Sequence, residues 1–222
     1  MQLPSTSSLR EIARTHLQEP GIQKEKIKEQ SILYDKMLNE KVQKGETPLP
    51  VKEGIIVFDE VKVSGKIAWN TASGKIVGVG LPETALSSLF DLFGKPEESP
   101  KPAEYVLQFL YRDMSSSFDF IGPYFTKAAA FTSDDIYEYF LQVLRCFEAS
   151  GFNVRGVICD GASSNLSLIR KITEQEGDIP ISEEARFGTP YIPRILHPYR
   201  RGMYIYWIIC PSHQVEETLI RY

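Results

Sequence analysis

Hydrophobic and polar positions alternate along several segments of the chain and repeat with a helical period along others. Residues 54–63, GIIVFDEVKV, are typical of a strand in which four apolar residues run into Asp59 and Glu60. A hairpin is predicted next, because KIAWN and KIVGVG flank the turn sequence TASG. Residues 103–114, AEYVLQFLYRDM, are largely apolar on both alternating faces, which indicates a central strand. The core is therefore expected to begin with strands.

Helical periodicity is clearest over residues 133–151, SDDIYEYFLQVLRCFEASG. Apolar residues recur there at spacings of three and four and form one continuous stripe. Thr132 or Ser133 can cap the start of this helix, and Gly151 can end it. The segment predicts an amphipathic helix that packs on the core.

Two more helices are predicted near the amino end, over residues 5–18 and 22–44. The second carries apolar residues among many charges, as a solvated helix packed on the core does, although DNA or a partner helix is an alternative contact. GETPLP, residues 45–50, contains two prolines and a glycine and predicts a boundary. We therefore divide the chain into an amino-terminal helical segment, 1–50, and a main domain, 51–222.

Strands and helices alternate in the second half of the chain. VRGVICD, residues 154–160, predicts a strand, and residues 161–175 predict a turn and a helix. A loop rich in proline and arginine, 186–202, leads to the strand MYIYWIIC, 203–210, and the start of a helix follows at 211–222. Strands followed by alternating helices and strands predict an α/β fold.

Composition narrows the class of protein. The chain has 222 residues, of which 42% are hydrophobic and 24% charged, as expected of a soluble globular protein with a core of its own. No apolar run reaches the roughly 20 residues of a membrane span, and the first residues lack the pattern of a signal peptide. A net charge of −4 argues against a surface that binds nucleic acid throughout, while residues 1–52, with nine Lys or Arg against seven Asp or Glu, leave room for a local basic face.

Zinc chemistry is not indicated by the cysteine and histidine positions. Cys146, Cys159 and Cys210 lie in apolar segments without metal-ligand spacing, and we interpret them as buried, reduced thiols of an intracellular protein. His213 lacks companions for a zinc site and is interpreted as structural.

Two aspartates are the candidates for chemistry. Asp59 lies inside the first strand, where burial without a partner would cost several kcal/mol, and Asp160 ends a later strand just before Gly161. Functional groups of α/β sheets gather at the carboxyl ends of strands. If the two strands are neighbours, the acids face one another, and a divalent cation would remove their repulsion. Oxygen ligands select Mg²⁺ or Mn²⁺.

Each acid also has a structural interpretation. Asp160 could form an Asx turn or cap the helix that follows it. Asp59 could pair with a lysine such as Lys62 or Lys66. The residues by themselves leave both interpretations open.

Four segments resemble one known family. FDEVKV, followed by IAWN and TASGKIVGVG, resembles the start of the catalytic domain of P-element-type transposases, which include the THAP-domain transposase relatives. GFNVRGVICDGASSN resembles the second acidic motif of that family, and LPSTSSLREI and CPSHQ are similar to further family segments. The resemblance covers nearly the whole chain and implies an RNase H-like fold, with a mixed sheet and helices on both faces.

The resemblance implies a DDE-type recombinase that acts on the DNA of transposon ends in the nucleus, with self-association as a further expectation. Asp59 and Asp160 would be catalytic residues and ligands of two Mg²⁺ or Mn²⁺ ions. The family also uses GTP through an inserted domain, with a third acid beyond it. We expect neither in this chain, because it stops before both, and we interpret Glu216 and Glu217 as acids at a helix start. The zinc ligands of a THAP domain are not found. The chain is thus expected to be an incomplete transposase core.

The loop YIPRILHPYRRGMYIYW combines basic and aromatic residues. Arg194, Arg200 and Arg201 could contact DNA phosphates and the aromatic rings could stack on bases, although a structural connection would use the same residues. The alternative function is a non-catalytic DNA- or protein-interaction module derived from a transposase. An unrelated nucleotide-binding protein is disfavoured, because neither GxGxxG nor GxxxxGK[ST] occurs.

Overall fold

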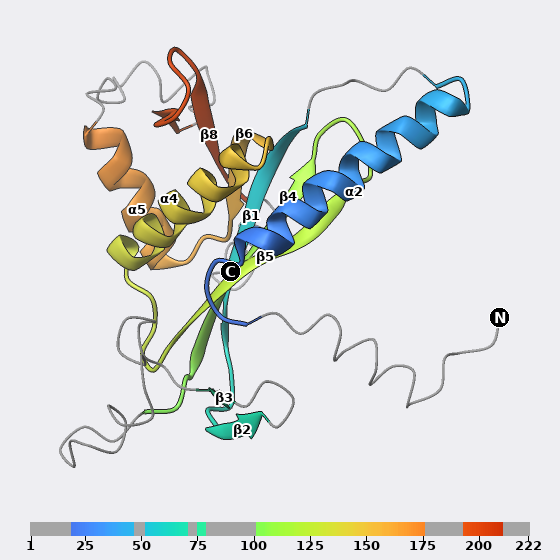
Figure 1. Cartoon of the computed structure of the whole chain (residues 1–222). Coiled ribbons are helices and arrows are strands. Elements are labelled where there is room, and N and C mark those ends of the chain that lie inside the picture. The colour runs from blue at the N-terminus through green and yellow to red at the C-terminus, as the bar shows by residue number, and fades with distance from the viewer. Residues whose placement is uncertain (1–18, 47–51, 71–74, 79–100, 176–192, 211–222) are drawn as a thin grey trace, which may run out of the picture.

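The computed structural model describes residues 19–46, 52–70, 75–78, 101–175 and 193–210 (Figure 1). Its large sheet has six strands in the order β5-β4-β1-β6-β8-β7, and β2 and β3 form a separate hairpin. The strands are β1 Glu53–Lys62, β2 Ala68–Asn70, β3 Lys75–Val77, β4 Tyr105–Asp113, β5 Asp119–Lys127, β6 Asn153–Cys159, β7 Arg194–Leu196 and β8 Tyr204–Ile209. The helices are α2 Lys24–Gln43, α4 Ser133–Ala149 and α5 Ser163–Gln175. The helices expected at residues 5–18 and 211–222 lie outside the described residues.

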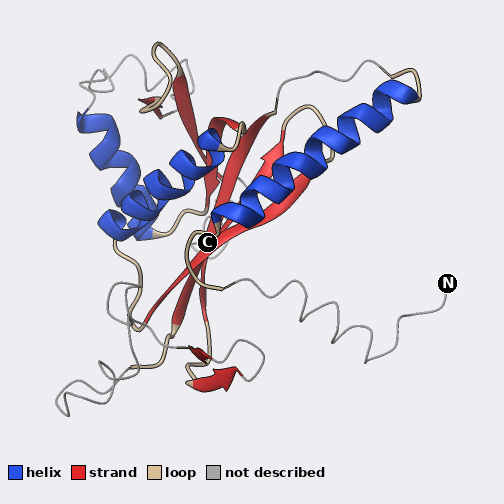
Figure 2. Cartoon of the chain, in the orientation of Figure 1, coloured by secondary structure: helices blue, strands red, loops and turns tan. Residues whose placement is uncertain are grey.

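One face of the large sheet carries the hydrophobic core. Alternate side chains of the central strands are buried there, among them Ile56, Phe58, Leu107, Phe109, Tyr111 and Trp207. The cluster also contains buried residues of α2, α4 and α5. Figure 2 shows these helices beside the sheet and the β2–β3 hairpin apart from them. The described helices therefore cover one face of the sheet, where the resemblance implied helices on both.

The opposite face of the large sheet is open over the described residues. Ile121, Tyr206 and Ile208 point to this side and are 62%, 41% and 40% exposed. Parallel pairing of β1 with β6 and antiparallel pairing of β1 with β4 make the sheet mixed. The predicted α/β class and mixed sheet are confirmed, and one sheet face presents apolar and acidic side chains together.

β5 and β7 were not predicted from the sequence. β5 contains Gly122 and Pro123, which interrupt a strand pattern, but it lies at the edge of the sheet, where a residue without an N–H is tolerated. The β4–β5 register shifts beside this pair of residues, and the amide of Gln108 donates to the carbonyls of Gly122 and Pro123 at 2.9 and 3.2 Å. β7 is three residues long, too short to produce a pattern.

The helix predicted at residues 133–151 is confirmed as α4. Thr132 is its N-cap, and a reciprocal capping box joins the Thr132 side chain to the backbone N–H of Asp135 and the Asp135 carboxylate to the N–H of Thr132. Gly151 follows the C-cap residue Ser150 with a φ of 86°, a left-handed conformation that favours glycine. Local sequence therefore sets both ends of this helix.

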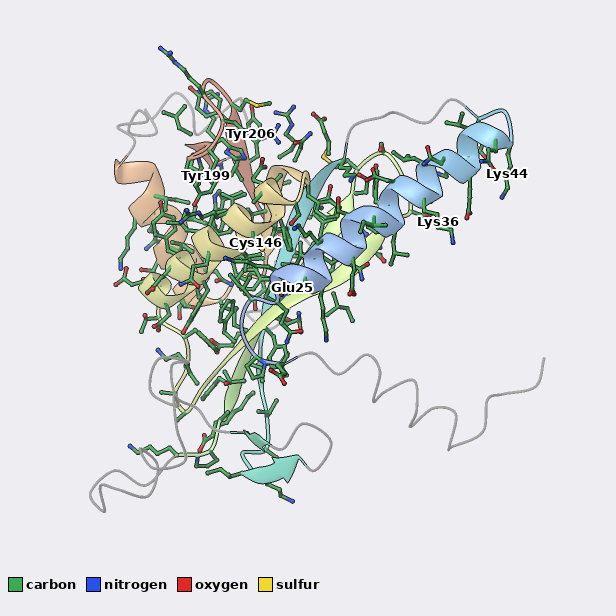
Figure 3. All side chains as sticks on the ribbon, in the orientation of Figure 1. Glu25, Lys36, Lys44, Cys146, Tyr199 and Tyr206 are labelled. Carbon is green, nitrogen blue, oxygen red and sulfur yellow. The ribbon has the colours of Figure 1, made fainter. Side chains whose placement is uncertain are left out.

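α2 is attached to the same core as the sheet. Its buried residues are Ile27 and Tyr34, and the Tyr34 hydroxyl donates to the buried carboxylate of Asp113 at 3.1 Å. Glu25, Lys36 and other charged residues lie along the exposed side of the helix (Figure 3). None of the helices in the described ranges is long and apolar enough to cross a bilayer.

Candidate functional site

The two predicted site residues lie on neighbouring parallel strands. The last paired residues of β1 and β6 are Val57 and Ile158. Asp59 lies two residues after Val57, and Asp160 lies two residues after Ile158. If the register continues unchanged, Asp59 is level with Asp160, and the alternation of side chains puts both on the open face. Neighbouring strands are about 4.8 Å apart, so both carboxylates are within reach of one ion.

The register between β1 and β6 contains a β-bulge. Gly54 is paired with Val154, but the next pair is Ile55 with Gly156, so Arg155 is an extra residue on β6. Every pair after the bulge is displaced by one residue relative to the pairs before it.

This extra residue decides which side chain lies beside Asp59. The register before the bulge, continued to Asp59, would put Cys159 beside it, whereas the register after the bulge, continued two residues past Val57 and Ile158, puts Asp160 there. The Arg155 guanidinium donates to the Glu53 carboxylate through Nε at 3.1 Å and Nη2 at 2.5 Å. An ion pair between the same two strands thus holds the bulge.

The carboxylate of Asp59 is exposed to solvent, so the expectation that it is withdrawn from water was wrong. The strand is covered on one side only, and Asp59 points to the other. Within the described residues it forms no hydrogen bond or ion pair, with Lys62, Lys66 or any other residue. Lys62 lies instead over the ring of Tyr105, 5.6 Å from its centroid. Both Asp59 oxygens remain available to a ligand.

Only one of the two carboxylate oxygens of Asp160 accepts hydrogen bonds from the described residues. Its Oδ1 accepts the backbone N–H of Ala162 at 3.1 Å and the side-chain amide of Asn165 at 2.6 Å. This confirms the turn-forming role predicted for Asp160. Its Oδ2 has no hydrogen-bond partner among the described residues. A structural role for one oxygen therefore leaves the other free, and the two interpretations of Asp160 are compatible.

Comparison with known proteins identifies the family. The family model of the TNP-like, RNase H N-terminal domain matches residues 27–173, which are 147 of the 222 residues. The chain belongs to this family. The fold is similar to that of the Drosophila P element transposase in its strand transfer complex, with a TM-score of 0.50 and 13% identity over 98% of this chain and 51% of that chain. The predicted P-element-type resemblance and RNase H-like fold are confirmed.

A second solved transposase structure is less similar to this chain. The mariner Mos1 paired end complex with Mg is similar at a TM-score of 0.25 and 9% identity, over 78% of this chain and 49% of that chain. No curated protein matches the sequence. The TNP-like chain spans about half the length of each of these two transposases.

The three arginines predicted to contact DNA have different environments in the TNP-like domain. Arg194 lies over the ring of Tyr204, with its guanidinium carbon 4.4 Å from the centroid. Arg200 bonds to the buried carboxylate of Glu148 at 2.5 Å. Arg201 is exposed in the turn between β7 and β8. Arg200 therefore has a structural role, while Arg201 remains accessible.

Thiols do not add ligands to the candidate site. Cys146, Cys159 and Cys210 are not in disulfides; the first two are buried and Cys210 is half-buried. Burial, with smaller contributions from the adjacent Asp160 and from Cys210, raises the pKa of Cys159 to about 12, so that its thiol stays protonated. Cys146 lies on α4 (Figure 3), and burial raises its pKa as well. Across the described ranges, no group of three or more Cys, His, Asp or Glu could hold a metal ion.

Proposed function

We propose that this TNP-like domain is part of a DDE-type transposase that cleaves and joins DNA strands, with Asp59 and Asp160 as two of its cation ligands. The observation that supports the proposal is the β1–β6 register, whose last pair is Val57 with Ile158 and whose continuation by two residues brings the two acids level. The cleavage chemistry and the residues are our proposal, whereas membership of the family is established by the match over residues 27–173.

The residues present fit a divalent cation. Asp59 offers two carboxylate oxygens and Asp160 offers Oδ2, and oxygen donors of this kind suit Mg²⁺ or Mn²⁺. Two negative charges about 5 Å apart repel by about 1 kcal/mol in water and about 3 kcal/mol at an effective dielectric of 20. A bound cation would offset that repulsion and supply Lewis-acid polarisation of a phosphodiester oxygen.

The task of this chain's own residues is positioning. Asp59 projects from a central strand that is paired on both sides, and Asp160 is held by the turn that starts α5. Groups fixed in this way need little reorganisation during reaction. A third carboxylate is part of the proposal, and it would come from outside the described residues.

Contact with DNA is proposed for the same open face. Arg194 is paired with Tyr206 in the β7–β8 ladder, and Tyr206 is level with Gly156 of β6. These positions share a face with Asp160. Figure 3 shows Tyr206 on β8, where its 41% exposed ring could stack on a base. Nuclear location, GTP use and self-association follow from the resemblance to transposases and stay predictions.

The experiment compares cation-dependent stabilisation of the wild-type chain with that of Asp59→Asn and Asp160→Asn. Thermal unfolding is followed with and without Mg²⁺ or Mn²⁺. We expect the cation to raise the wild-type Tm and to have little effect on either variant, because each loses a charged ligand.

Asp119→Asn is the matched control. Asp119 is an exposed acid on the open face of β5 and pairs with Arg112 at 3.3 Å. Its loss should leave the cation response unchanged. An equal response in the wild type and both site variants would remove the assignment and favour the non-catalytic interaction module.

A further inference from the structure

Asn165 is a buried polar residue in the first turn of α5. It is 4% exposed, and its Nδ2 donates to Asp160 Oδ1 at 2.6 Å, which is short for a hydrogen bond to nitrogen. Its Oδ1 is buried and has no hydrogen-bond partner among the described residues. The NH₂ group of the amide thus holds Asp160, and the carbonyl oxygen has no hydrogen-bond partner in the described part of the chain.

The orientation of the amide follows from hydrogen-bond chemistry. An ionised carboxylate only accepts, so the NH₂ group of Asn165 must face Asp160. Rotating the amide by half a turn would bring two acceptors together. The unpartnered atom is therefore the carbonyl oxygen, and leaving it buried costs free energy that an apolar side chain of similar size would avoid.

We propose that Asn165 is a positioning residue that orients the Asp160 carboxylate for cation binding; this inference rests on the proposed function. Both donors to Asp160, from Ala162 and Asn165, bind the same oxygen. Two bonds to Oδ1 fix the rotation of the carboxylate and leave Oδ2 for the ion shared with Asp59. The neutral amide does this without adding a charge beside two acids.

Packing alone does not account for this residue. The neighbouring buried positions of α5, Leu168, Ile169 and Ile172, are apolar. A leucine at 165 would fit the same layer and would leave no orphaned acceptor. The amide is needed for its donor.

The test measures cation binding to the ¹⁵N-labelled full chain by NMR. Mg²⁺ is titrated while the amides of Gly161 and Ala162 and the side-chain NH₂ of Asn165 are followed. For Asn165→Leu we expect the apparent affinity to fall about 10- to 100-fold, as when a partner that orients a metal ligand is lost. Its Tm without cation should be unchanged or higher, because the orphaned acceptor is gone.

Two variants keep the test decisive. Leu168→Ala removes buried packing from the same helix, so it should lower the Tm and leave the affinity unchanged. Asn165→Ala replaces Asn165→Leu if the latter does not fold, with the same expected loss of affinity.

The two proposals fail in different ways. A wild-type affinity in Asn165→Leu, with Asp59→Asn still abolishing binding, would overturn the inference alone. Equal losses of affinity in Asn165→Leu and Leu168→Ala would likewise show that helix stability, and not orientation of Asp160, is responsible. A wild-type chain without a Mg²⁺ response, or one unaffected by Asp59→Asn, would overturn the proposed function and the inference with it.

Discussion

Asp59 and Glu60 are neighbouring acids with opposite environments. Glu60 points to the helix-covered side of β1, where its carboxylate accepts the backbone N–H of Phe131 at 2.9 Å. Asp59 points to the open side and has no partner among the described residues. Successive strand residues face opposite sides of a sheet. Glu60 therefore has a structural role, whereas the adjacent Asp59 can bind a ligand.

Asp135 provides a test at the residue scale. Burial raises its pKa, but hydrogen bonds from Lys127, at 2.6 Å, and from Thr132 outweigh burial and hold the pKa below its ordinary value. A carboxyl with a lowered pKa in the folded state stabilises the fold above its unfolded pKa of about 4, and the benefit is lost as the pH falls through the folded pKa.

Asp135→Asn should therefore lower the free energy of unfolding by about 1 kcal/mol at neutral pH, the usual cost of a lost cap. The difference from the wild type should shrink below about pH 4. Urea unfolding at several pH values measures it. Asp134→Asn is the control, since Asp134 is highly exposed in its pair with Lys171. A difference that stays constant down to acidic pH would contradict the assignment.

At the scale of elements, a buried carboxylate joins the β7–β8 hairpin to α4. Glu148 accepts the N–H of Val154 at 2.9 Å, Nε2 of His197 at 3.0 Å and Nε of Arg200 at 2.5 Å. His197 Nδ1 accepts the N–H of Tyr199, so Nε2 must carry the proton that is donated to Glu148. Three donors, one from β6 and two from the connection between β7 and β8, thus converge on one helix residue.

Glu148→Gln should destabilise the protein by about 1.5 to 3 kcal/mol, because hydrogen bonds to a charged group are replaced by weaker ones and one donor loses its acceptor. Hydrogen exchange should accelerate first at the amides of Ile195 and Trp207. Glu138→Gln, at an exposed position of the same helix, is the control. Uniform acceleration over the whole sheet would argue that Glu148 supports the global core and not the hairpin.

The sequence predicts elements well where local rules decide the structure. α4 follows from its apolar stripe and its caps, and β1 from its run of apolar residues. β5 was not predicted because Gly122 and Pro123 interrupt the pattern of a strand. These residues are tolerated because β5 lies at the edge of the sheet. Which strands are neighbours is a property of the whole sheet, so the pairing of Asp59 with Asp160 could only be posed as a condition.

At the scale of the molecule, α2 is part of the core. Sequence patterns placed a boundary at residue 50, yet Tyr34 packs edge-on against Phe118 and Phe152, with ring centroids 4.9 and 6.3 Å apart. The family match also starts inside α2, at Ile27. The proline and glycine residues after α2 indicate where the helix ends. They do not by themselves indicate that a domain ends there.

A fragment starting at residue 51 should therefore be markedly less stable than the full chain, because it exposes the aromatic rings that α2 covers. Near-ultraviolet circular dichroism and thermal unfolding measure the loss. Tyr34→Phe in the full chain is the matched variant: it keeps the ring and loses the bond to Asp113, at a cost of about 1 kcal/mol. A fragment as stable as the whole protein would support the predicted domain boundary at residue 50.

The bulge at Arg155 makes the proposed chemistry depend on the number of residues in a strand as well as on their identity. The bulge absorbs the one residue that β6 has in excess of β1. If the same sequence paired without the bulge, Asp160 would turn toward the helices and Cys159 would lie beside Asp59, although both aspartates would still be present. Alignments that score only the presence of acidic residues would miss such a change, so the register of this strand should be weighed as heavily as its substitutions.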